Sequence, residues 1–129
     1  MSHEEAVIKA AAELVQAFGA HDTDAYFACF SADATFIFHS LPQALGSLAA
    51  YRALWQGWER DGFHVLGCRS SDGQVMVHGE VAVFTHRVET HLRLAGEEHQ
   101  LQERETIVFR LEGERWVAFH EHLSGVPAS

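Results

Sequence analysis

Apolar positions recur with a helical period early in the chain and with a strand-like pattern later. In residues 4–18 they return every three or four residues, which is typical of an amphipathic helix, and Gly19 ends that segment. Asp22 is a residue type that caps helices, so a second, short helix is expected after it, ending near Ser31. Two short helices therefore precede the first predicted strand.

Between residues 34 and 62 the pattern predicts one strand followed by a third helix. Residues 34–39 are aromatic and β-branched, which favours a strand, and residues 41–46 contain the Pro and Gly of a loop. Ser47 is placed to cap a helix, and Asp61-Gly62 is placed to end it.

Everything after residue 62 is typical of a sheet. The strand-like segments are 63–69, 74–78, 81–94, 99–111 and 115–123, and short Gly-containing breaks of the kind found in hairpins separate them. Helices first and antiparallel strands afterwards predict an α+β fold, with the helices on one face of a curved sheet. Since no linker or repeat interrupts the chain, we expect a single domain over residues 1–129.

Strand alternation predicts which side chains face the helices. The odd-numbered positions of the last predicted strand are Val117, Phe119, Glu121 and Leu123, an apolar set apart from the carboxylate. In the preceding strand Ile107 shares a face with Glu103 and Glu105, while Arg104 and Thr106 take the opposite face. We expect the apolar face to meet the helices and the other face to meet solvent or a second subunit.

Composition and charge narrow the function classes. The chain has 129 residues, 47% of them hydrophobic, and a formal net charge of −9 with His neutral. Such an acidic balance argues against an extended nucleic-acid or anionic-membrane surface. The N-terminus lacks the basic region of a signal peptide and no run of about 18 apolar residues occurs, so a cytoplasmic location is expected. Cys29 and Cys68 lack metal-site spacing and are expected to be buried, reduced thiols.

The C-terminal third resembles a known signature. Glu105-Thr106, residues 112–116 and residues 120–125 resemble the ET…DGxW…HxHxSG pattern of calcium/calmodulin-dependent protein kinase II association domains and their small bacterial SnoaL-like relatives. Asp22, Tyr26 and Gly79-Glu80 fit the same pattern. These proteins belong to the nuclear transport factor 2-like superfamily, which also includes ketosteroid isomerase, scytalone dehydratase and limonene epoxide hydrolase.

The resemblance implies a cystatin-like α+β barrel: a cone-shaped, curved antiparallel sheet with three N-terminal helices packed on its concave face. It implies a small hydrophobic molecule in the enclosed pocket and a homodimer formed through the outer sheet face. A cofactor-independent isomerase, cyclase or dehydratase using a pocket carboxylate is one hypothesis. A non-catalytic ligand-binding or oligomerisation module, similar to the kinase association domain, is the alternative.

Glu121 is the main catalytic candidate. Its apolar neighbours would desolvate the carboxyl group and raise its pKa into a range useful for a general acid or base. Alternatively, it pairs with Arg87 or lies in water at a pocket mouth. Glu89 and Glu105 are further candidates of the same kind. Tyr26 could donate a hydrogen bond to a developing oxyanion, as a helical Tyr does in ketosteroid isomerase, although residues 37–39 lack the base expected there by comparison with that enzyme.

A substrate-binding surface is expected from aromatic rings on the helices and first strands, with polar groups from the sheet. Its predicted members are Phe30, Phe38, His39, Trp55, Trp58, His64, Arg87, Glu89, Glu105, Ile107 and Phe119. Each ring alone is equally explained as core, and each His as a hydrogen-bonded structural residue.

His120 and His122 raise a metal hypothesis. Two imidazoles on one strand face lie about 6 to 7 Å apart and could bind one ion. The further Glu and His that accompany such a pair in cupins do not follow here, because Leu123-Ser124-Gly125 comes next. A hydrogen-bonded or interfacial role is the alternative, and we expect no metal and no cofactor, since the chain also lacks a Gly-rich phosphate loop.

Overall fold

The computed structural model describes residues 1–127, which form three helices and five strands. The elements in chain order are α1 (His3–Gly19), α2 (Thr23–Phe27), β1 (Phe30–Phe38), α3 (Leu48–Arg60), β2 (His64–His78), β3 (Val81–Leu94), β4 (Glu97–Glu112) and β5 (Arg115–Gly125). The strands make one sheet in the order β1-β5-β4-β3-β2. The predicted α+β class is confirmed.

One pairing departs from the predicted antiparallel sheet. β2, β3, β4 and β5 are joined by antiparallel pairing, but β1 runs parallel to β5. No tight hairpin follows β1, because the loop after it and α3 carry the chain from one edge of the sheet to the other. The parallel neighbours β1 and β5 are therefore separated in the sequence by all the other strands, and the sheet is mixed.

The predicted helix caps are present. Asp22 accepts a hydrogen bond from the backbone N–H of Ala25 (3.2 Å), and Ser47 accepts one from that of Ala50 (3.1 Å). These bonds satisfy N–H groups that the first helical turn leaves free. The second helix is shorter than expected, because β1 begins at Phe30 and draws the following residues into the sheet.

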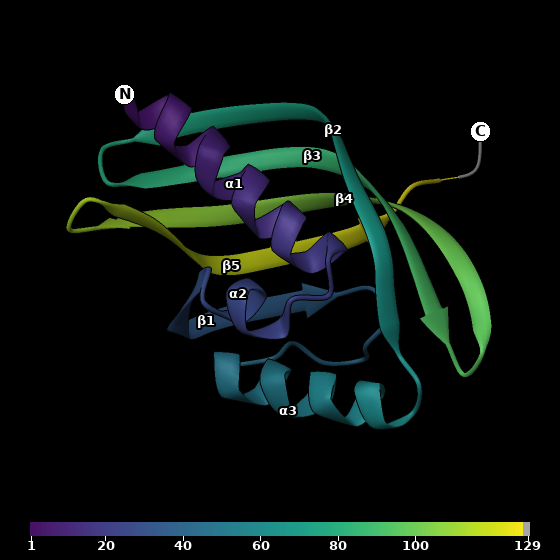
Figure 1. Cartoon of the computed structure of the whole chain (residues 1–129). Helices are drawn as coiled ribbons and strands as arrows, with labels where there is room; N and C mark the ends of the chain where they lie inside the picture. Colours follow the sequence, from purple (N-terminus) through teal and green to yellow (C-terminus); the bar gives the residue numbers. More distant parts are fainter. Residues whose placement is uncertain (128–129) are drawn as a thin grey trace.

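The sheet bends around the helices instead of lying flat. In Figure 1, α1 crosses the concave face and α3 lies beyond β1, while β2, β3 and β4 extend past the helices and curl. The predicted hairpin at residues 71–73 is wrong, because β2 continues through it with a register shift between Ser71 and Gln74. Such bulges increase the local bend of a long strand. At Gly73 a side chain would meet the Phe84 ring at 3.1 Å, so the absence of a side chain permits this close approach.

A bulge in β5 corrects the predicted faces of the last strand. Val108 lies opposite His120 and Phe109 lies opposite Ala118, so Phe119 is the extra residue. The alternation therefore changes phase: Trp116 and Ala118 join the core before the bulge, and Glu121 faces the same side after it. The prediction that Phe119 shares the face of Glu121 is wrong.

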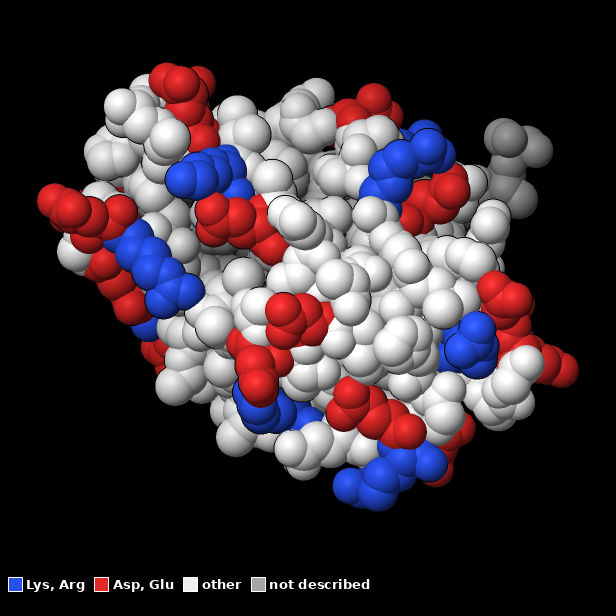
Figure 2. Space-filling model, in the orientation of Figure 1, with Lys and Arg blue, Asp and Glu red and all other residues white. Residues whose placement is uncertain are grey.

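The core lies between the helices and the concave face. Its largest fully buried side chains are Trp55, Tyr26, Phe27, Phe36, Phe109 and Ile107. On the face seen in Figure 2, basic side chains are dispersed among acidic ones. None of the helices within residues 1–127 is both long and apolar enough to cross a membrane.

Candidate functional site

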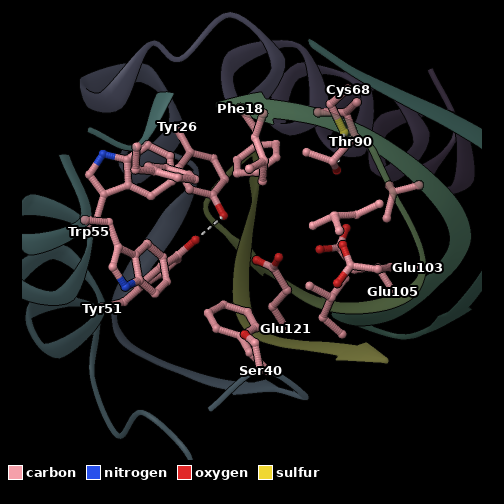
Figure 3. Close-up of a pocket in the computed structure, with 18 of the residues that line it drawn as sticks. Phe18, Tyr26, Ser40, Tyr51, Trp55, Cys68, Thr90, Glu103, Glu105 and Glu121 are labelled. Atoms are coloured by element: carbon pink, nitrogen blue, oxygen red, sulfur yellow. Dashed lines mark hydrogen bonds between the residues drawn. The ribbon is translucent and has the colours of Figure 1, made fainter. Parts of the chain in front are cut away.

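A cavity of about 450 Å³ opens between the three helices and the concave face of the sheet. Its size is in the range of small-molecule sites. It is lined by Leu14, Val15, Phe18, Tyr26, Phe38, Ser40, Leu41, Tyr51, Trp55, Trp58, Phe63, Cys68, Val88, Thr90, Leu92, Leu94, His99, Leu101, Glu103, Glu105, Glu121 and Leu123. Figure 3 shows a wall of aromatic rings on one side and a group of carboxyl groups on the other.

The helices position the aromatic wall. Tyr26 on α2 and Tyr51 on α3 are joined through their hydroxyl oxygens at 3.0 Å. The indole N–H of Trp55 donates to Thr23 Oγ1 (3.2 Å), which fixes the ring between the two helices. Burial, and next the negative charge of Glu121, raise the pKa of Tyr26 well above its usual value. The phenols therefore remain protonated and can donate hydrogen bonds.

The sheet positions three carboxyl groups on the opposite side. Glu103 and Glu105 alternate along β4 and so share a face, and Glu121 on β5 lies opposite Ile107, beside that row. All three side chains belong to residues that are less than a tenth exposed. In Figure 3, Glu121 points into the space between the tyrosine pair and the two β4 carboxyl groups.

Two of these carboxylates have histidine partners. Glu103 Oε2 lies 2.5 Å from His39 Nε2, and Glu105 Oε1 lies 2.7 Å from His86 Nε2. Because a carboxylate accepts, each histidine nitrogen donates. The other ring nitrogen of His86, Nδ1, lies 2.6 Å from Ser70 Oγ, so the chain Ser70–His86–Glu105 fixes the Glu105 side chain.

Glu121 differs from both. Its Oε2 is buried and has no hydrogen-bond partner among residues 1–127. Burial is the largest cause that raises its pKa well above the usual value, followed by the negative charge of Glu105 and a hydrogen bond with it. The protonated form of Glu121 is therefore favoured, next to the Glu105 carboxyl group that His86 holds. Such a pair offers an acid and a base at one place.

Six predicted site residues line the cavity: Glu121, Tyr26, Phe38, Trp55, Trp58 and Glu105. Phe30 and Ile107 are instead part of the core behind the lining. His39 lies at the rim, where it contacts Glu103 but does not line the cavity itself.

Four predicted residues lie elsewhere. Arg87 and Glu89 alternate with the β3 residues that face the cavity and so point to the convex face, where Glu89 contacts Arg69 at 3.5 Å. The alternative pairing of Glu121 with Arg87 is therefore wrong. His64 is exposed and its ring stacks on that of His21 at 4.3 Å, while the bulge turns Phe119 towards Arg110.

Sequence reasoning did not place Tyr51, Cys68, Thr90 or Glu103 in the pocket, nor His86 behind it. Tyr51 precedes Trp55 by one helical turn, and Glu103 alternates with Glu105 along a strand. The spacing of each residue therefore predicts that it shares a face with a candidate pocket residue. His86 became a partner of Glu105 only through the pairing register of β3 and β4.

His120 and His122 lie on the convex face with ring centroids 6.4 Å apart. His120 Nδ1 lies 2.7 Å from Thr35 Oγ1, so one ring nitrogen is already engaged in a hydrogen bond. Burial lowers the pKa of His120, and so does the charge of His122. Within residues 1–127, no three His, Cys, Asp or Glu side chains are grouped to hold a metal ion.

The sequence of this chain matches the model of a known family. Residues 7–129 match the model of the SnoaL-like domain. This chain belongs to the SnoaL-like domain family. A search of curated proteins found no match to this chain.

Solved structures share the fold at low sequence identity. A nuclear transport factor 2-like protein from Cytophaga hutchinsonii is 13% identical with a TM-score of 0.83, and the match covers 98% of this chain and 100% of that one. The calcium/calmodulin-dependent kinase II hub homology domain of Chlamydomonas reinhardtii is 21% identical with a TM-score of 0.77, covering 98% and 100%. The association domain of the same kinase from C. elegans is 20% identical with a TM-score of 0.72, covering 94% of each chain. Such likenesses establish the fold, while function must be argued from the site.

Proposed function

We propose that this SnoaL-like domain binds a small, largely apolar molecule in the cavity and moves a proton on it with Glu121, without a cofactor. The observation that carries the proposal is the buried, unpartnered Oε2 of Glu121 at the edge of an aromatic cavity. A buried polar atom without a partner costs about 1 to 3 kcal/mol, and a ligand that supplies the partner removes that cost.

The proposed reaction is enolisation of a carbonyl compound. Glu121 donates its proton to the carbonyl oxygen while the ionised Glu105 accepts a proton from the adjacent carbon. The C–H bond breaks, its electron pair forms the C=C bond of the enol, and the carbonyl π pair takes up the proton from Glu121. In the return step Glu105 gives its proton to carbon and Glu121 takes back the enol O–H proton, so both carboxyl groups are restored. Return to the same carbon gives hydrogen exchange, and return to the γ-carbon of a conjugated dienol gives an isomer. The Tyr26 and Tyr51 hydroxyls lie where they could donate to the developing oxygen charge.

Hydrogen exchange tests this reaction without knowledge of the natural substrate. In D₂O, the wild-type protein should exchange the α-hydrogens of 1-tetralone about 100-fold or more faster than Glu121→Gln, as followed by proton NMR. Glu89→Gln is the matched control, since it makes the same substitution on the convex face, outside the cavity, and it should retain the wild-type rate. If wild type and Glu121→Gln exchange at the same rate, Glu121 is not the acid.

The second candidate function is a binding or assembly module without turnover. It is suggested by the likeness to the kinase hub homology domain and to the kinase association domain. We propose that the chain associates as a homodimer through the convex face, which presents the exposed apolar side chains of Ile37, Met76 and Val81. Light scattering should give twice the chain mass. A mass well above a dimer favours assembly, and a monomer contradicts the proposed interface.

A further inference from the structure

The charge of the cavity lining is one-sided. Three carboxyl groups line it, those of Glu103, Glu105 and Glu121, and within residues 1–127 the lining contains no Lys or Arg. The basic group in the lining is His99, whose side chain is 44% exposed. An anionic ligand would meet carboxyl groups and the negative faces of aromatic rings, and both repel it.

We propose that the ligand of this cavity is an apolar organic cation, seated with its positive charge against Glu121 and its flat body on the aromatic wall of Tyr26, Tyr51 and Trp55. The inference rests on the proposed function for the choice of cavity, and it adds the charge of the molecule that the cavity takes.

Glu121 is the expected contact, because its buried Oε2 has no partner among the described residues, whereas each of the other two carboxylates accepts from a histidine. His39 donates to Glu103 and His86 donates to Glu105. A cation beside Oε2 supplies the missing partner. Because the site is shielded from water, a charge pair there is stronger than at the surface, and the surrounding ring faces add cation–π attraction.

The positive charge can arise in two ways. A permanent cation binds ionised Glu121, which releases its proton to solvent on binding. A neutral nitrogen base instead takes that proton: the O–H bond of Glu121 breaks, an N–H bond forms, and a carboxylate–cation pair remains. Either way the same ion pair results.

The groups that face Glu121 decide the pH dependence. They are Glu103 and Glu105 on β4, Cys68 on β2, Tyr26 on α2 and Tyr51 on α3. Glu105, Cys68 and Glu103 raise the pKa of Glu121 and so disfavour its negative charge, whereas the protonated hydroxyls of Tyr26 and Tyr51 are hydrogen-bond donors. A bound cation offsets this rise in pKa. Binding of a permanent cation should therefore strengthen as pH rises towards the pKa of Glu121.

Three probes of nearly the same shape test the charge: 1-methylquinolinium (positive), 1-methylnaphthalene (neutral) and 1-naphthoate (negative). By titration calorimetry on the full chain, the cation should bind about tenfold or more tighter than the neutral probe, and 1-naphthoate should bind weakest. Repeating the calorimetric titrations in buffers of different ionisation enthalpy gives the number of protons released or taken up on binding. We expect release with 1-methylquinolinium and none with quinoline, which arrives neutral.

Variants locate the contact. Glu121→Gln should weaken 1-methylquinolinium to the affinity of 1-methylnaphthalene and leave the neutral probe unchanged. Glu105→Gln keeps an acceptor for His86, so it serves as a second variant if Glu121→Gln does not fold, and it should weaken the cation by a smaller factor. Glu89→Gln, the same substitution on the convex face, should bind all probes as wild type does.

The inference is overturned if the neutral probe binds as tightly as the cation, if Glu121→Gln keeps full cation affinity, or if the cation does not bind at millimolar concentration. The proposed reaction has its own readout. Glu121-dependent exchange of 1-tetralone together with tighter binding of the neutral probe would reject the cation and leave the proton transfer standing. Tighter binding of the cation without exchange of 1-tetralone would reject the proton transfer and leave the cation proposal standing.

Discussion

The two faces of the sheet shift the pKa of a carboxyl group in opposite directions. On the convex side, the exposed Asp33 pairs with Arg110 at 2.9 Å, and hydrogen bonds from that guanidinium and from Ser31 lower its pKa to about 2. On the concave side, burial and the carboxylate of Glu105 raise the pKa of Glu121 well above its usual value. β1 and β5 are neighbours in the sheet, so the face to which a side chain points decides whether the pKa of its carboxyl group is raised or lowered.

The largest expected contrast between the faces concerns packing. Phe109→Ala removes a ring that is 1% exposed on the concave face and should lower the free energy of unfolding by about 3 to 5 kcal/mol. Phe119→Ala removes the bulged ring beside Arg110 and should cost about 1 kcal/mol. Urea denaturation measures both. Equal losses would mean that Phe119 faces the core and that the bulge is wrongly placed.

A smaller contrast concerns hydrogen bonds. Tyr51→Phe leaves the buried hydroxyl of Tyr26 without its partner and should cost about 1 to 2 kcal/mol of unfolding free energy. Thr35→Val removes the bond to His120 on the convex face, where water can replace it, and should cost about 0.5 kcal/mol. Denaturation of the two variants side by side provides the comparison, and a larger loss for Thr35→Val would contradict it.

The last contrast is a difference of sign in pH dependence. Glu121 has a raised pKa in the folded state, so the unfolded chain loses this proton first, and wild type loses stability relative to Glu121→Gln as pH rises above about 4.3. Asp33 has a lowered pKa, so its contribution is present above the unfolded pKa and is lost as pH falls towards 2. Melting temperatures across pH should therefore favour Glu121→Gln over wild type near neutrality, and Asp33→Asn should approach wild type in acid. A parallel pH profile for both variants would contradict the contrast.

Local patterns predicted much of the fold. The cap residues Asp22 and Ser47 and the bounds of β3 follow from residue type and alternation alone, because each depends on neighbours a few positions away. The parallel pairing of β1 depends on the path of the chain after it, and the bulge at Phe119 depends on the partner strand, so neither has a local signal.

The same limit applies to the pocket. Alternation places Glu103 and Glu105 on one face, and the composition of α3 predicts an aromatic wall. Glu121 lines the cavity as predicted. The simple alternation that placed it there puts Phe119 on the same face, whereas the bulge puts Phe119 on the other face. The partners that distinguish the three carboxyl groups, His39 and His86, come from distant segments and required the assembled sheet.

The protonation of Glu121 is the central claim, and a carbon-13 NMR titration of its carboxyl carbon tests it most directly. Loss of one signal in Glu121→Gln assigns the resonance. Our account predicts a midpoint well above the usual range of Glu side chains. A Glu121 carboxyl signal that titrates together with the exposed glutamates would contradict the account.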